Sequence, residues 1–286
     1  MVPTGISQII FRSFLETMKI VGMVILLMIL IEFLELRFKD KIREKITSSP
    51  LTQYVIASLL GAIPGCMDAF FIVSLYIHGI VGFGALTAEM LSTAGDEAYV
   101  MLALIPRTAL VIFALCALLG VVGGFLADGI VKRINLRTCE SCEIKALEEG
   151  SSLSLGYFLR EHLLEHIVRR HLVRLFLWIF LTLVVVSALE QYLSLETFIS
   201  SLPRWLLIVL AAVVGIVPES GPHLLFVVMY SKGLIPFSVL FVNTLSQDGH
   251  GLLPLLSYSV KDTVYVQIFT TLFALMVGVV ILFLGL

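Results

Sequence analysis

Two pairs of short polar motifs interrupt an otherwise apolar chain. The first pair is GAIPGCMDA over residues 61–69 and GIVPESGPH over 215–223, and the second is EMLSTAGDE over 89–97 and NTLSQDGHG over 243–251. Together they offer carboxylates, imidazoles, amides and hydroxyls. This set suits a hard or borderline divalent cation such as Mn²⁺, Mg²⁺ or Zn²⁺ better than a soft ion. The candidate metal ligands are Asp68, Glu89, Asp96, Glu219, His223, Asn243, Asp248 and His250.

Four further residues are candidates for supporting roles around such a site. Glu97 and Gln247 have the chemistry for an outer coordination sphere or a gate. Arg107 and Lys261 occupy equivalent positions after the second motif of each pair, where a cation could neutralise an empty acidic site. Alternatively, both long side chains extend to the membrane interface. The second pair of motifs could equally form a polar network that packs helices together.

Glycine and proline predict breaks in the helices that carry the first motifs. Pro64 and Pro218 each remove a backbone donor beside flexible glycines, so the helices should be interrupted there. Charged groups at such a break are functional when they lie at membrane depth. If the break lies at the membrane surface, the same charges are simply solvated.

The composition predicts a membrane protein. Hydrophobic residues make up 59% of the 286 residues and charged residues only 14%, with a mean hydropathy of +1.04. The first apolar run, 20–34, carries no cleavage signal and predicts a retained membrane helix. We expect an all-α polytopic fold of about ten transmembrane or half-membrane helices. The predicted parts are a first membrane repeat over 1–127, a cytoplasmic loop over 128–171, and a second repeat over 172–286.

The chain matches itself without a gap after a shift of 154 residues. Eleven of the 50 positions from Gly61 to Leu110 are identical in the second copy, glycines and a proline among them. Thirteen of the 19 Lys and Arg lie at 37–45 and 132–174, which places both of these segments in the cytoplasm. The segment before the second copy, 191–204, holds one basic residue and should face outward. The two five-element repeats are therefore predicted to be inverted, with both termini outside.

The polar loop carries two further patterns. Cys139 and Cys142 form a C-x-x-C, which is half a metal site or simply two loop thiols. His162, Glu165 and His166 form an H-x-x-E-H string, the inverted zinc-peptidase pattern, so a membrane-embedded zinc peptidase is an alternative function. This string lies on a predicted amphipathic helix over 157–170, and the rest of a peptidase core is missing. These histidines with His171 could instead form a regulatory metal site, or the helix could simply lie on the membrane surface.

These features favour a secondary transporter over an enzyme. The chain has no G-x-x-x-x-G-K-[ST] loop, so transport would draw on an ion gradient. Carboxylates that release protons when a dication binds suit exchange of metal against protons. The predicted partners are the metal ion, protons and the lipid bilayer, with no nucleic acid and no prosthetic cofactor. Uniport and a divalent-cation channel are the alternative transport modes.

The motifs resemble those of the ten-transmembrane heavy-metal exporter family, whose members also carry the labels manganese transporter and arsenic efflux protein. The resemblance lies in residues 61–71, 78–106, 215–227 and 241–255 and extends over nearly the whole chain. It implies efflux of metal from the prokaryotic cytoplasm across the inner membrane. The acidic motifs favour the manganese label over efflux of arsenic or another heavy metal, because arsenite usually binds thiols.

Overall fold

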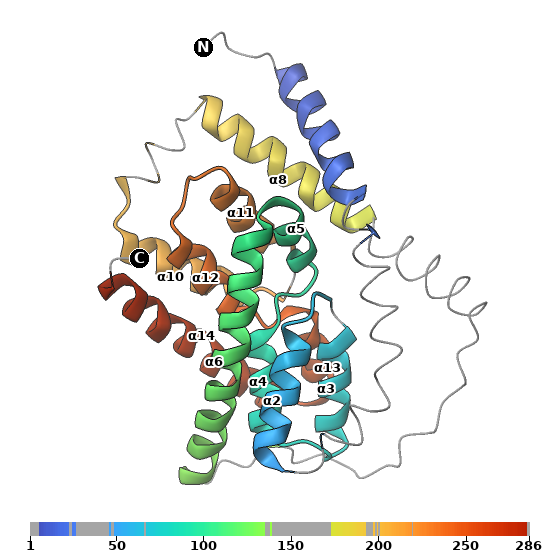
Figure 1. The fold of residues 1–286 in the computed structure, drawn as a ribbon, viewed down its shortest axis with the longest axis vertical. Coiled ribbons are helices and arrows are strands. Elements are labelled where there is room, and N and C mark those ends of the chain that lie inside the picture. The colour runs from blue at the N-terminus through green and yellow to red at the C-terminus, as the bar shows by residue number, and fades with distance from the viewer. Residues whose placement is uncertain are drawn as a thin grey trace, which may run out of the picture.

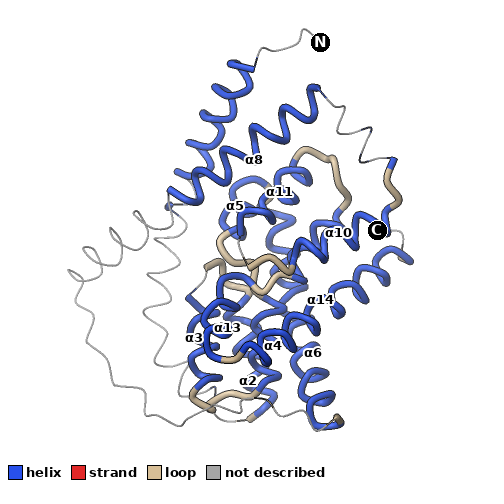
Figure 2. Tube along the Cα trace, turned by 180° about the vertical axis from the view of Figure 1, so that it is seen from behind, coloured by secondary structure: helices blue, strands red, loops and turns tan. Residues whose placement is uncertain are grey.

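The computed structural model describes residues 6–22, 25–26, 46, 49–65, 67–134, 138, 173–192, 197, 199, 201–218 and 220–284. Within these ranges the regular secondary structure is helical, and no strand occurs (Figure 2). The predicted all-α fold is therefore confirmed. The C-x-x-C cysteines, the predicted amphipathic helix and His162, His166 and His171 lie outside the described residues.

The helices fall into two series. The first is α2 (Pro50–Gly61), α3 (Met67–Ile77), α4 (Phe83–Ser92), α5 (Glu97–Leu104) and α6 (Pro106–Arg133). The second is α10 (Arg204–Gly215), α11 (Ser220–Ser231), α12 (Phe237–Ser246), η2 (Gly249–Gly251), α13 (Leu252–Tyr258) and α14 (Val260–Phe283). A helix over residues 6–22 and α8 (Val173–Tyr192) lie side by side at one end of the molecule (Figure 1).

The two series repeat one arrangement of helices. A shift of 154 residues carries both ends of α2 onto those of α10, and both ends of α4 onto those of α12. It also carries Gly79 and Gly95 onto Gly233 and Gly249, and all four have positive φ. Contacts between the series are reciprocal, because α3 packs on α13 while their counterparts α11 and α5 pack on each other. Such reciprocity is typical of an approximate twofold relation.

Both predicted breaks at proline are present. α2 ends at Gly61 and α3 begins at Met67, so Pro64 lies between them, and Pro218 lies likewise between α10 and α11. After the first break the chain reverses direction. The evidence is a contact between the two far ends of the helix pair: the N–H of Gly82, after α3, donates to Oε1 of Gln53, near the start of α2, at 3.1 Å. Had α3 continued along the axis of α2, its 11 residues alone would carry the chain about 16 Å further away. The first motif is thus the tip of a helical hairpin.

The apolar run expected over 98–127 is two helices, which corrects the sequence-based expectation. α5 ends before Ile105, whose φ of −136° and ψ of 54° leave the helical region, and α6 begins at Pro106. Proline disfavours helical backbone in the residue before it, which accounts for the break. The second series is broken likewise at Ser259, whose hydroxyl caps α14 by accepting from the Asp262 N–H.

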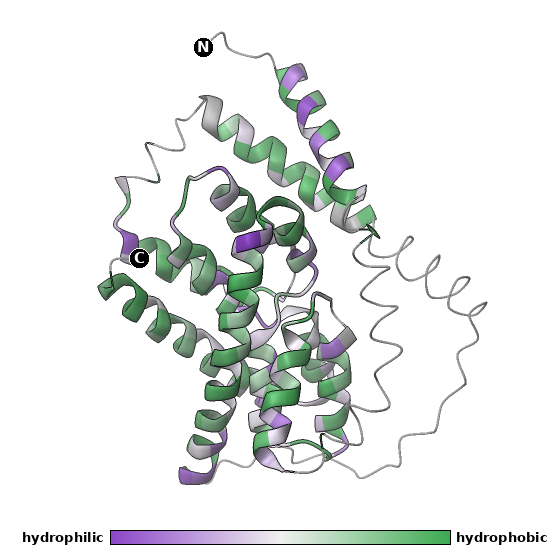
Figure 3. Ribbon diagram, viewed as in Figure 1, coloured by the Kyte–Doolittle hydropathy of each residue, from purple (hydrophilic) through white to green (hydrophobic). Residues whose placement is uncertain are grey.

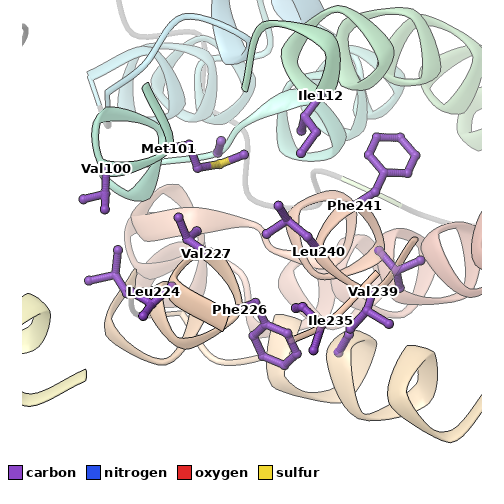
Figure 4. Packing of buried hydrophobic residues seen from close by; sticks show 14 of the residues in the cluster. Val100, Met101, Ile112, Leu224, Phe226, Val227, Ile235, Val239, Leu240 and Phe241 are labelled. Atoms are coloured by element: carbon purple, nitrogen blue, oxygen red, sulfur yellow. The ribbon is translucent and has the colours of Figure 1, made fainter. Parts of the chain in front are cut away.

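Close packing of small residues joins the helices of each series. A Cβ on Gly124 of α6 would lie 2.5 Å from the Gly84 carbonyl of α4, so these two backbones are in direct contact. Glycine pairs of this kind are characteristic of helix packing in membranes. Met101 of α5, Ile112 of α6 and Leu240 of α12 belong to one buried apolar cluster, which joins the two series (Figure 4).

Two helices of the described part, α6 and α14, are long and apolar enough to cross a membrane. Both are hydrophobic along most of their length (Figure 3). Leu110, Leu118 and Phe125 on α6 are 62%, 63% and 67% exposed, so an apolar stripe faces outward. Lipid is the solvent that accepts such a stripe. Shorter apolar helices of 10–17 residues accompany them, among them the segments 204–215, 221–231 and 237–246.

Candidate functional site

Three carboxylates from both series approach one another where the motifs meet. Asp68 lies in the first turn of α3, Glu89 lies in α4, and Asp248 follows the end of α12. The charge of Glu89 interacts with those of Asp68 and Asp248. All three side chains are buried, Glu89 completely. The hairpin tip and the ends of α4 and α12 thus bring residues 180 positions apart into one acidic centre.

Two of these carboxylates accept no hydrogen bond in the described part of the chain. Both Oε atoms of Glu89 and both Oδ atoms of Asp248 are buried without such a partner. Thr270 on α14 lies beside Asp248, although its hydroxyl donates to the Gln267 carbonyl at 3.2 Å. A buried carboxylate without compensation costs several kcal/mol. The arrangement therefore has the chemistry to take up a cation or a proton.

Glu97 and Gln247 form a direct hydrogen bond between the two series. Gln247 Nε2 donates to Glu97 Oε1 at 2.8 Å, and both side chains are buried. Glu97 Oε2 has no partner among the described residues, and the Cys116 thiol of α6 lies close to this carboxylate. The two residues assigned to an outer sphere or a gate thus meet at the boundary between the repeats.

His223 and Asn243 belong to a network around the second break. His223 Nδ1 lies 3.3 Å from Asn243 Oδ1, and His223 Nε2 lies 3.1 Å from the Val217 carbonyl. Asn243 Nδ2 donates to the Ala211 carbonyl at 2.9 Å. Both imidazole nitrogens therefore face protein oxygens. In this conformation the pair tie α10, α11 and α12 together, and metal ligation by His223 would require one of these contacts to break.

The rest of the candidate pool is distributed unevenly. Asp96 is buried at the start of α5. Glu219 and the side chain of His250 lie outside the described residues. Within the described part, no three His, Cys, Asp or Glu side chains are close enough together to hold one metal ion. The acidic centre is consequently a shared environment and not a closed ligand shell in this conformation.

Arg107 and Lys261 are exposed. Arg107 lies in the first turn of α6, and Lys261 lies in the first turn of α14 with its Nζ 5.9 Å from the centre of the Tyr265 ring. The structure does not place either one as a buried counter-ion. Their positions agree with the alternative of extension to the interface.

Sequence reasoning overlooked two acids that accept hydrogen bonds, the buried Asp262 and the half-buried Asp128. Asp262, next to Lys261, is 2% exposed and accepts a 3.0 Å hydrogen bond from the Tyr76 hydroxyl. An aspartate within an apolar run is itself a signal at membrane depth. Asp128 is a second example, since it accepts from the Tyr54 hydroxyl at 2.5 Å and from the Gly84 N–H at 2.7 Å.

The repeated broken helices and the buried acidic centre define a polytopic α-helical membrane protein of transporter architecture. The chain belongs to the family described as "Putative, 10TM heavy-metal exporter", whose model matches residues 6–197 and 177–285. This description names an exporter. Neither a curated protein nor a solved structure matches the chain.

Proposed function

We propose that the protein exports a divalent metal cation, with Mn²⁺ favoured, from the prokaryotic cytoplasm across the inner membrane in exchange for protons. The observation that carries the proposal is the pair of buried carboxylates, Glu89 and Asp248, whose oxygens accept no hydrogen bond in the described part of the chain. Together with Asp68 they come from both repeats. Transporters of this architecture hold their substrate where the two repeats meet.

The charge of the centre supports a dication as substrate. The carboxylate of Glu89 interacts with those of Asp68 and Asp248, while the two candidate counter-ions, Arg107 and Lys261, are exposed. Oxygen ligands suit Mn²⁺, which fills its coordination sphere with carboxylates, carbonyls and water. Asp96, Glu219, His223, Asn243 and His250 are the candidates to complete the sphere during transport.

Proton exchange follows from the same chemistry. Carboxylates must be deprotonated to bind a metal, so metal binding releases protons and metal release takes them up. Each repeat can then present the centre to one side of the membrane, loaded alternately with metal and protons. The chain offers no phosphate-binding loop for nucleotide, which supports an ion gradient as the source of energy.

A proteoliposome assay tests the proposal. Purified protein is reconstituted around a pH-sensitive dye, Mn²⁺ is added to one side, and metal flux and internal pH are recorded together. We expect Mn²⁺ flux with an opposite proton flux, and acceleration by an imposed proton gradient. Metal flux without any pH change would leave uniport, and arsenite flux without Mn²⁺ flux would refute the metal assignment.

Substitutions in the same assay connect transport to the acidic centre. Glu89→Gln and Asp96→Asn are expected to abolish Mn²⁺ flux while the protein remains folded. Glu16→Gln, on an exposed position of the N-terminal helix, is the control and should transport normally. Currents far above carrier turnover rates in planar bilayers would favour a channel instead.

A further inference from the structure

Two equivalent tyrosines make equivalent contacts between the repeats. Tyr76 of α3 donates to Asp262 of α14 at 3.0 Å, and Tyr230 of α11 lies 3.5 Å from Thr108 of α6, hydroxyl to hydroxyl. A shift of 154 residues converts one pair into the other. We call Tyr76–Asp262 the inner contact and Thr108–Tyr230 the outer contact, after the sides on which the charge distribution predicts that they lie.

The two contacts lie toward opposite ends of the molecule. Tyr76 lies near the end of α3, beyond which Gly82 meets Gln53 at the start of α2. Asp128 meets Tyr54 and Gly84 at this same end. Thr108 lies 20 residues before Asp128 on α6, which is about 30 Å along a helix. The start of α2 and the end of α6, which lead to the two basic segments, therefore lie on the side of the inner contact.

The acidic centre lies between the two contacts. On α3, Asp68 precedes Tyr76 by eight residues, or about 12 Å of helix. On α6, Cys116 follows Thr108 by eight residues, and it lies close to Glu97, whose hydrogen-bond partner Gln247 directly precedes Asp248. The counterpart of Cys116 on α14 is Thr270, eight residues after Asp262 and beside Asp248. Each contact thus joins the repeats about two helical turns away from the centre.

The two contacts differ in strength. The inner contact pairs a hydroxyl donor with a carboxylate, and both residues are buried, at 1% and 2% exposed. The outer contact joins two neutral hydroxyls at the limit of hydrogen-bond distance, and both residues are half-buried. Hydrogen bonds to a charged acceptor are roughly twice as strong as neutral ones.

We propose that these contacts close the two ends of the transport route, and that the stronger Tyr76–Asp262 contact holds the metal-free protein closed on the side of the basic segments. Opening on that side requires the inner contact to break, while the outer contact breaks at little cost. The inference rests on the proposed transport only for the need to open alternately, and it is independent of which ion is carried.

Accessibility of cysteines beside the centre tests the inference without metal. One reporter is Cys116 as the single cysteine, with Cys66, Cys139 and Cys142 replaced by serine. The other is Thr270→Cys in a background without the native cysteines. A membrane-impermeant maleimide is applied to right-side-out and to inside-out vesicles, and the labelling rates from the two faces are compared for each variant.

Tyr76→Phe removes the inner hydrogen bond and retains the ring. We expect labelling from the face of the basic segments to rise about tenfold, the factor associated with a lost hydrogen bond to a charged group. Tyr230→Phe is the matched control at the equivalent position and should change the ratio of the two rates less than about twofold. Thr108→Asp gives the outer contact a carboxylate, and it should slow labelling from the opposite face.

Asp262→Asn serves as a second variant should Tyr76→Phe fold poorly, and it is expected to shift labelling in the same direction. An unchanged ratio in both inner variants, an equal shift in Tyr230→Phe, or no labelling of either reporter in any variant would overturn the inference. If the labelling shifts as expected while proteoliposomes carry no Mn²⁺, the metal assignment fails and the gating inference stands. If proteoliposomes carry Mn²⁺ while the labelling is unchanged, the gating inference fails and the metal assignment stands.

Discussion

Two substitutions in the first repeat should separate stability from metal binding, because one should abolish metal binding with little loss of stability and the other should lower stability and leave metal binding intact. Glu89→Gln and Asp128→Asn both convert a carboxylate into an amide of the same size. Glu89 is fully buried and accepts no hydrogen bond from a described residue. Asp128 accepts two, from the Tyr54 hydroxyl at 2.5 Å and the Gly84 N–H at 2.7 Å. The pair therefore tests the proposal that Glu89 binds a cation, against Asp128, whose hydrogen bonds stabilise the fold.

The magnitudes follow from these contacts. Glu89→Gln breaks no hydrogen bond and removes a charge beside Asp68 and Asp248, so metal-free stability should fall by less than ~1 kcal/mol or rise. Asp128→Asn turns one acceptor oxygen into a donor and loses a charge-assisted bond, which costs about 1.5–3 kcal/mol. For a protein of this size that corresponds to a lowering of Tm by roughly 4–10 °C.

Metal should close most of the difference in Tm between the two variants. A ligand at 100 times its Kd stabilises the folded state by about 2.7 kcal/mol, or roughly 5–10 °C in Tm. We expect this Mn²⁺-dependent shift in the wild type and in Asp128→Asn, and its loss in Glu89→Gln.

Thermal melts of the purified protein in detergent, with and without Mn²⁺, provide the measurement. Mg²⁺ at the same concentration controls for ionic strength. The reasoning is refuted if Glu89→Gln retains the Mn²⁺ shift, or if it lowers the metal-free Tm more than Asp128→Asn does.

Three further predictions follow. Gly61→Ala should destabilise the protein by about 1–3 kcal/mol in thermal melts, because its Cβ would lie 2.7 Å from the Glu89 carbonyl oxygen. Gly129→Ala, which meets nothing within 4 Å, should be neutral or stabilising, and equal effects of the two changes would contradict the packing. Glu97→Ala should cost about 1–3 kcal/mol because it leaves the buried Gln247 amide unpaired, whereas Gln247→Ala in the same background should add little, and full additivity would argue against the bond. Impermeant maleimide should label native Cys139 and Cys142 in inside-out vesicles only, and labelling from the outside would place the basic segments there and reverse the predicted topology.

The breaks were predictable from sequence, but the course of the chain after them was not. Pro64 and Pro218 disrupt a helix wherever it lies, because proline lacks a donor and its ring clashes with the preceding turn. The reversal into a hairpin depends on packing of α3 against α4 and on the Gln53–Gly82 contact, residues 29 apart. The split at Ile105 was missed because Pro106 lies within a long apolar run. In the second repeat the residue equivalent to Ile105 is the polar Ser259, which marks the corresponding break.

The candidate site was predictable as a set of residues and not as an arrangement. The sequence placed Asp68, Glu89 and Asp248 in a pool of eight candidate ligands, and the structure brings the carboxylates of Asp68 and Asp248 close to that of Glu89. The same reasoning could not separate Glu89, which accepts no hydrogen bond from a described residue, from His223, whose two nitrogens face protein oxygens. The inverted direction of the repeats in the membrane, the identity of the metal and the exchange with protons remain predictions.

The sequence by itself determined the helical membrane fold, the duplication and the breaks at Pro64 and Pro218, because these depend on hydropathy, periodicity and local backbone limits. Only the tertiary structure decided which polar groups are satisfied. Burial and hydrogen bonding are set by what the other repeat places opposite each residue. Tyr76 meets a carboxylate on α14 whereas Tyr230 meets a hydroxyl on α6, and this difference arises only when the two repeats pack together.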